Sequence, residues 1–125
     1  MKINAYNCTG ITRTSQLIND AGFIVAITWK TKFLDLENNL SIGPRSYQNL
    51  INLVKVWLPK SVQRIDADYS YKAPFLNANK NAVIFTDVVD EQAIPETWSE
   101  FWNYANLEVR YNSTKLDYEY YQNNK

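Results

Sequence analysis

The sequence contains no histidine and a single cysteine, Cys8, among 125 residues. Histidine is the usual general base and the commonest metal ligand, because its unperturbed pKa lies near neutrality. Its absence excludes Ser-His and Cys-His nucleophiles and most zinc sites. One cysteine cannot form an internal disulfide, which is typical of a reducing compartment. We therefore expect a protein that is not an enzyme and that has no cofactor or metal.

Other common features are also scarce. The three glycines are scattered, so no glycine-rich loop precedes a helix in the pattern that binds phosphate. No apolar run approaches the ~20 residues needed to span a bilayer. Residues 1–7 are polar and lack the apolar core of a signal peptide. We expect a location in the cytoplasm or in a virion, without secretion by a signal peptide and without a membrane partner.

The chain has the length and composition of one globular domain covering residues 1–125, with 46% hydrophobic and 14% aromatic residues. The net charge is zero but unevenly spread. Residues 1–65 carry eight Lys/Arg against three Asp/Glu, whereas residues 66–125 carry five against ten. Two interpretations remain open. Folding could interleave the two halves, or a basic face could meet the acidic face of a neighbour in a head-to-tail contact.

Three segments have the spacing of an amphipathic helix. Apolar side chains recur at steps of three and four over residues 44–58, between Pro44, which suits a first helical turn, and Pro59, which ends it. Residues 95–105 carry early acids and a face of aromatic side chains, and residues 14–21 form a shorter candidate.

The remaining apolar segments have the patterns of strands. Residues 23–34 and 65–71 alternate, the second with its tyrosines on the inward side, and residues 82–89 form a continuous apolar run typical of a buried strand. Residues 107–121 predict a hairpin, and residues 1–7 an edge strand. The sequence thus predicts a single α+β domain, a mostly antiparallel sheet with two to three helices packed on it.

Carboxylates are densest at Asp87, Asp90 and Glu91. A divalent metal needs several oxygen ligands that converge, and no glycine-bearing calcium loop accompanies this cluster. Asp66 and Asp68 lie two residues apart on a predicted strand, a spacing compatible with an acid and a base in sugar hydrolysis. Such chemistry also requires one acid in an apolar pocket, which the sequence does not indicate. Both clusters therefore fit a solvated surface better than an enzyme site.

Nucleic acid is a further alternative. Aromatic side chains that could stack on bases are Trp29, Phe33, Tyr69 and Tyr71. A basic surface could form from Lys30, Lys32, Arg45, Lys55, Lys60 and Arg64. Binding of nucleic acid normally accompanies a positive excess, and the chain has none. We expect nucleic acid not to be the partner.

The surplus of aromatic side chains instead indicates protein contacts. Tyr104 falls off the aromatic face of residues 95–105, and Tyr120 and Tyr121 are adjacent, so on a strand they face opposite sides. Exposed tyrosines are enriched at protein interfaces. Together with charged side chains of both halves they make the predicted interface: Tyr104, Tyr118, Tyr120, Tyr121, Lys30, Lys32, Arg45, Asp87, Asp90, Glu91 and Glu96.

These features favour a non-enzymatic structural or assembly subunit of a larger protein particle. Its most concrete form is a small phage virion component of the neck, tail or connector type, whose partners are copies of itself or neighbouring subunits. The alternative is a small inhibitor or immunity-type protein that binds one partner 1:1. The two differ in stoichiometry, because an assembly subunit meets many neighbours.

Overall fold

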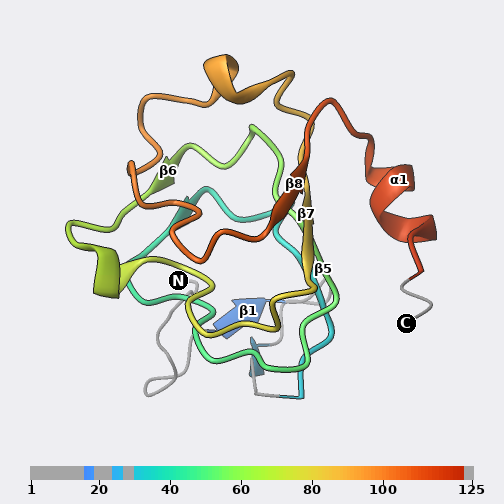
Figure 1. Ribbon diagram of the computed structural model, residues 1–125, viewed down its shortest axis with the longest axis horizontal. Coiled ribbons are helices and arrows are strands. Elements are labelled where there is room, and N and C mark those ends of the chain that lie inside the picture. Colours follow the sequence, from blue (N-terminus) through green and yellow to red (C-terminus); the bar gives the residue numbers. More distant parts are fainter. Residues whose placement is uncertain (1–15, 19–23, 27–29, 123–125) are drawn as a thin grey trace.

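A computed structural model describes residues 16–18, 24–26 and 30–122. Within them the chain forms short strands, two single-turn 3-10 helices and one α-helix (Figure 1). In chain order these are β1 (Gln16–Ile18), β2 (Ile24–Ala26), β3 (Phe33–Asp35), β4 (Ser41–Ile42), β5 (Lys55–Trp57), β6 (Arg64–Ile65), η1 (Ser70–Lys72), β7 (Val83–Phe85), η2 (Glu91–Ala93), β8 (Glu108–Arg110) and α1 (Lys115–Tyr120). No helix among these residues is long and apolar enough to cross a membrane.

Four parallel strands form the main sheet, in the order β3-β5-β7-β8. The central residues of the strands pair in register along one row: Leu34, Val56, Ile84 and Val109. A second sheet pairs β4 with β6 in parallel, and a bridge from Ile65 to Trp98 extends it by one more segment. β1 and β2 pair antiparallel with each other.

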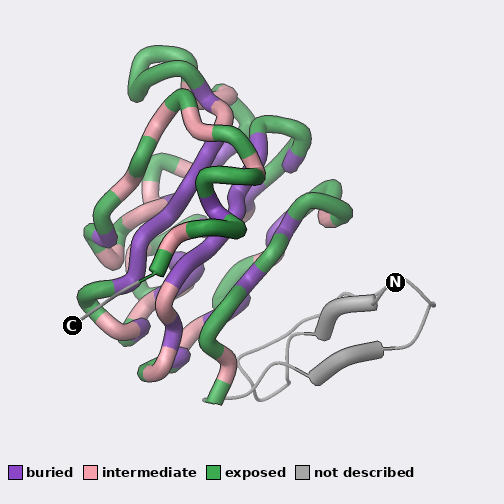
Figure 2. The backbone as a smooth tube through the Cα atoms, turned by 90° about the vertical axis from the view of Figure 1, so that its right-hand side faces the viewer, coloured by how far each residue is buried: buried purple, intermediate pink, exposed green. Residues whose placement is uncertain are grey.

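The chain visits the two parallel sheets alternately. The first coil runs from β3 through β4 (residues 33–54), the second from β5 through β6 (55–82) and the third from β7 past Trp98 (83–107), after which the chain reaches β8. Each circuit therefore stacks on the previous one, which is the architecture of a short solenoid of coils (Figure 1). Figure 2 shows the buried parts of neighbouring strands running side by side through this stack.

The core lies inside the coils. Its side chains come from both sheets and from the return loops, which lead from β4 to β5 (residues 43–54) and from β6 to β7 (residues 66–82). The fully buried large side chains are Leu34, Leu36, Ile42, Leu50, Leu53, Val56, Leu58, Val62, Ile65, Phe75 and Ile84. Tyr47 of the first return loop stacks on Phe75 of the second, with ring centroids 6.0 Å apart. Burial of these apolar surfaces is the main stabilising term of the coil stack.

The predicted fold class is wrong, because the strands of the main sheet are parallel and the described residues contain one six-residue α-helix. Turns and β5 replace the helix predicted over residues 44–58. Arg45, Tyr47 and Asn49 have positive φ values of 65°, 62° and 66°, which a right-handed helix does not contain. Backbone N–H groups of this loop bond to the next coil instead, as in Arg45 to the carbonyl of Lys72 (2.8 Å).

Residues 95–105 are not helical either. Their backbone N–H groups bond three residues back, as in Trp98 to Pro95 (3.0 Å) and Trp102 to Ser99 (3.0 Å). Trp98 lies in the bridge to Ile65, and Trp102 packs edge-on against it with ring centroids 5.4 Å apart, so both are buried without an α-helix.

The other predicted segments had mixed outcomes. Within residues 82–89, β7 is a fully buried strand as predicted. Residues 65–71 hold β6 and then η1, and the second arm of the hairpin predicted over 107–121 is α1. The described part of residues 14–21 is the strand β1. The predicted strand 23–34 is represented by β2 and β3, and residues 1–7 lie outside the described residues.

Substitution of Ile84, at the centre of the main sheet, tests this core. Ile84→Ala leaves a cavity between coils and should lower the free energy of unfolding by about 2–5 kcal/mol in urea denaturation. Val89→Ala is the control, because Val89 is exposed and its loss should change stability by less than about 0.5 kcal/mol. Equal losses in the two variants would contradict the placement of Ile84.

Candidate functional site

Two exposed tyrosines mark the most distinctive surface of the coil stack. Tyr69 and Tyr71 flank the start of η1, and their rings are stacked with centroids 5.6 Å apart and planes only 1° from parallel. Each residue is 57% exposed. Large parallel aromatic faces presented to solvent are typical of a contact surface.

Two cations lie against these rings. The Arg45 guanidinium carbon is 5.3 Å from the centroid of Tyr71. The Lys72 ammonium is 5.4 Å from the centroid of Tyr69 and 5.9 Å from that of Tyr71. These distances are within the range of cation–π attraction. We call Arg45, Tyr69, Tyr71 and Lys72 the tyrosine–cation patch.

The patch is built across two coils that are tied together beneath it. The Arg45 backbone N–H donates to the carbonyl oxygen of Lys72 (2.8 Å). The Gln48 side-chain Nε2 donates to the carbonyl oxygens of Tyr71 (3.2 Å) and Ala73 (2.8 Å). The loop that carries Arg45 is therefore fixed against the loop that carries both tyrosines, and the patch is organised before any partner binds.

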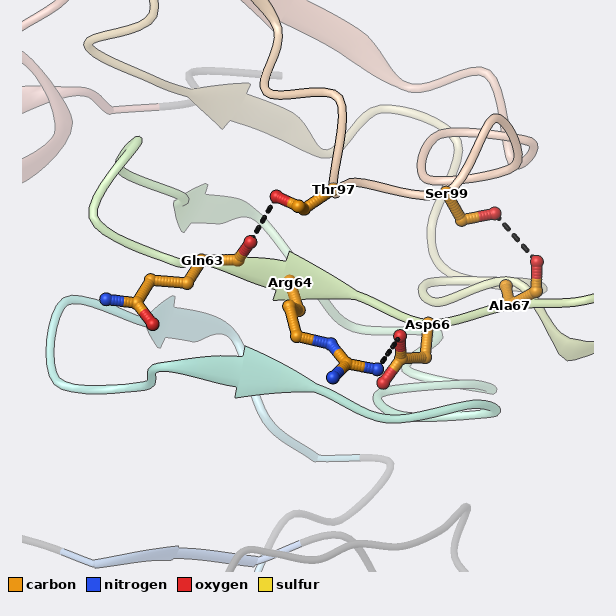
Figure 3. A network of polar contacts seen from close by, with 6 residues as sticks. All are labelled: Gln63, Arg64, Asp66, Ala67, Thr97 and Ser99. Atoms are coloured by element: carbon orange, nitrogen blue, oxygen red, sulfur yellow. Dashed lines mark hydrogen bonds and ion pairs between the residues drawn. The ribbon is translucent and has the colours of Figure 1, made fainter.

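The third coil holds the segment that leads into Tyr69 (Figure 3). The Ser99 hydroxyl donates to the carbonyl oxygen of Ala67 (2.7 Å), and the Thr97 hydroxyl donates to the carbonyl oxygen of Gln63. On the outer side of the same segment Arg64 and Asp66 form an ion pair (2.9 Å). Strand β6 is thus clamped at both ends, and this determines where the chain enters η1.

No family model matches the chain, and no curated protein or solved structure is significantly similar to it. What the patch can bind therefore follows from its own side chains.

Of the predicted interface residues, only Arg45 belongs to the patch. The four predicted tyrosines lie elsewhere: Tyr104 is exposed against Phe101, Tyr120 is 78% exposed on α1, Tyr121 is half-buried and Tyr118 is buried. The alternating pattern of residues 65–71 predicted Tyr69 and Tyr71 on the inward side. They face solvent because β6 ends at Ile65, and the alternation of a strand no longer applies beyond it.

The predicted acidic residues share the loop that follows β7, residues 87–96. Asp90, Glu91 and Glu96 are exposed, and Asp87 is half-buried and accepts a bond from the Lys60 backbone N–H (2.7 Å). In the described ranges no group of three or more Cys, Asp or Glu side chains converges as a metal would require. Lys30 and Lys32 are exposed just before β3.

The order of the coils follows the sequence, and this affects the distribution of charge. In a solenoid each coil contacts its neighbours, so residues far apart in the chain lie far apart along the stack. Of the described residues, the basic side chains between residues 30 and 65 precede or belong to the first two coils, and the acidic loop 87–96 belongs to the third. α1 is the exception, because it folds back onto β5 and β7.

α1 covers the outer face of the main sheet. Tyr118 packs on Trp57 and Phe85, with ring centroids 6.5 and 6.2 Å apart. Beside it the Lys55 ammonium donates to the carbonyl oxygens of Tyr118 (2.6 Å), Glu119 (3.1 Å) and Tyr121 (3.3 Å). A cation at the C-terminal end of a helix interacts favourably with the unpaired carbonyls there.

The charge of Lys55 is held in a buried position, since the residue is only 8% exposed. Burial lowers the pKa of Lys55, and the Glu119 carboxylate opposes this shift. At the other end of the helix Lys115 forms ion pairs with Asp35 (2.9 Å) and Glu37 (3.0 Å). α1 is therefore fixed at both ends to residues of the first two coils.

Removal of the Lys55 ammonium should weaken this attachment. Lys55→Met keeps a flexible apolar stem but leaves three helix-terminal carbonyls without their donor, so the free energy of unfolding should fall by about 1.5–3 kcal/mol in urea denaturation. Lys80→Met is the control, because Lys80 is an exposed lysine of the loop before β7. Stability of Lys55→Met equal to that of the control would show that Lys55 does not hold α1.

Tyr118 provides a pH test of the same attachment. Burial, then the Asp35 and Glu119 carboxylates, raise the pKa of Tyr118, and Lys115 opposes them. Below pH ~10 the phenol is protonated in both the folded and the unfolded protein. Above pH ~10 the unfolded chain loses this proton first, so the free energy of unfolding falls with rising pH.

Between about pH 9 and pH 11 the wild-type protein should therefore lose more free energy of unfolding than Tyr118→Phe, which has no phenol to titrate. The comparison cancels the titration of the lysines, which both proteins share. Identical pH dependence in the two proteins would contradict the buried position of Tyr118.

Proposed function

We propose that the protein is a non-enzymatic assembly subunit that acts through protein–protein contacts, with the tyrosine–cation patch as a contact surface. The supporting observation is the pair of exposed parallel tyrosine rings with Arg45 and Lys72 against them. Tyrosine and arginine are the residue types that dominate the energy of protein interfaces. A component of a larger particle such as a phage virion is the most concrete form of this proposal.

The rigidity of the patch favours such a role. Backbone bonds to the neighbouring coil already order the two loops, so a partner does not have to order them on binding. Tyrosine side chains have few rotatable bonds and lose little entropy on contact. Single-stranded nucleic acid is a less suitable partner, because its binding normally accompanies an excess of positive charge and this chain has a net charge of zero.

The mass of the protein by light scattering tests the proposal. At about 100 μM and low salt the wild-type protein should exceed the monomer mass, and at about 1 μM it should not. The variant Tyr69→Ser/Tyr71→Ser should remain monomeric at both concentrations, because it lacks the aromatic surface.

Tyr120→Ser is the matched control, since it removes an exposed tyrosine on α1, outside the patch. Association that depends on Tyr120 and not on Tyr69 and Tyr71 would contradict the patch as the contact surface. A wild-type protein that is monomeric under every condition would contradict self-assembly and favour a 1:1 inhibitor of a foreign protein.

A further inference from the structure

We infer that the tyrosine–cation patch binds the acidic loop, residues 87–96, of a second copy of this chain in a head-to-tail contact. The inference rests on the proposed function and names its partner. It is drawn from charges that remain without an ion pair on two separate surfaces of one copy.

The first surface is the patch itself. Among the described residues, neither Arg45 nor Lys72 forms an ion pair with a carboxylate. By contrast, Arg64, Arg110 and Lys115 are each paired with carboxylates at 2.7–3.0 Å. The patch thus presents two positive charges that the fold does not neutralise.

The second surface is the acidic loop. Asp90, Glu91 and Glu96 are exposed, and within residues 30–122 none of them forms an ion pair. The Asp90 carboxylate accepts the backbone N–H of Gln92 (3.0 Å), which orders η2. Val89, adjacent to these acids, exposes 57% of its surface. The loop therefore combines negative charge with an apolar side chain, which complements a patch of cations and tyrosine rings.

One copy cannot bring its own two surfaces together. The acidic loop connects β7 of the main sheet to Trp98 of the second sheet, whereas η1 lies on the return path from β6 to β7. Figure 1 shows the two short helices at different corners of the coils, residues 70–72 in yellow-green and 91–93 in orange. A contact between unlike surfaces must therefore join separate copies, and repetition of it produces rings or filaments.

Charge reversal tests the contact directly. Arg45→Glu/Lys72→Glu places negative charge on the patch, and Glu91→Lys/Glu96→Lys places positive charge on the loop. Each variant alone should need at least about ten-fold more protein than wild type to associate, because its two surfaces now repel each other. An equimolar mixture of the two should recover the wild-type mass in light scattering, since every patch then meets a loop of opposite charge.

Lys32→Glu/Lys80→Glu is the charge-matched control for the patch variant, because it makes the same change of net charge at exposed lysines outside the patch. Far-UV circular dichroism and urea unfolding check that every variant is folded. The control should associate as the wild type does.

The outcomes separate the inference from the proposed function. If the wild type associates and the reversals have no effect, or if each reversal abolishes association and the mixture does not restore it, the acidic loop is not the occupant, while an assembly role stands. If the wild type stays monomeric, the inference and self-assembly fail together. The contact is supported only if the mixture of the two charge-reversed variants recovers the association that each variant has lost.

Discussion

Parallel stacking of one coil on the next is the constraint on which the rest of this structure depends. Each strand of the main sheet has three residues, too few to be stable alone, so each coil must place an apolar side chain at the same position of the ladder. The return loops obey the same constraint. The Asn49 backbone N–H donates to the carbonyl oxygen of Leu76 (2.7 Å), and the Asn77 side-chain Nδ2 donates to the side-chain Oδ1 of Asn49 (3.1 Å).

The stack also explains the unusual backbone of the loops. Arg45, Tyr47 and Phe75 have positive φ values, a conformation that costs a side-chain-bearing residue of this kind on the order of 1–3 kcal/mol. Burial of Tyr47 and Phe75 and hydrogen bonds between coils offset this strain. Arg45 shares the strained loop without being buried, and the same geometry directs its guanidinium toward the Tyr71 ring. The patch is therefore a consequence of how the coils stack.

The outer face of the main sheet imposes a second requirement. Trp57, Val83 and Phe85 point away from the inside of the coils and need a cover, which Tyr118 and Tyr121 provide. A six-residue helix is too short to form alone, so α1 exists because it packs there and because Lys55 and Lys115 hold its ends. Among the described residues the Trp57 indole N–H is buried beneath this cover without a hydrogen-bond partner, which costs on the order of 1–3 kcal/mol.

The sequence revealed which side chains are buried better than which elements bury them. The apolar run of β7 and the inward Trp98 and Trp102 are where the pattern predicts them. A step of three to four residues, however, fits a series of tight turns as well as a helix, and propensity could not decide between them. The coils hide their repetition, because Leu34, Val56, Ile84 and Val109 recur after 22, 28 and 25 residues.

One signal for the C-terminal helix was available in the sequence. Thr114 and Asp117 form a capping box at the start of α1, a pattern that predicts a helix where the alternating tyrosines predicted a strand. The site was harder to predict, because Arg45 and Tyr71 meet only through the pairing of two return loops. No local sequence pattern predicts that pairing.

In a solenoid, charges that lie far apart in the sequence also stay far apart along the stack. In a fold that packs segments from opposite ends of the chain together, acidic and basic segments interleave and their fields cancel locally. Here the coils keep the order of the sequence, so Arg45 and the loop 87–96 remain on different coils and at different corners. α1 shows what the fold does with charges that it can pair: it folds back and brings Lys115 to Asp35 and Glu37. Among the described residues Arg45, Lys72 and the acids of the loop have no such route, so within one copy these charges remain solvated instead of paired.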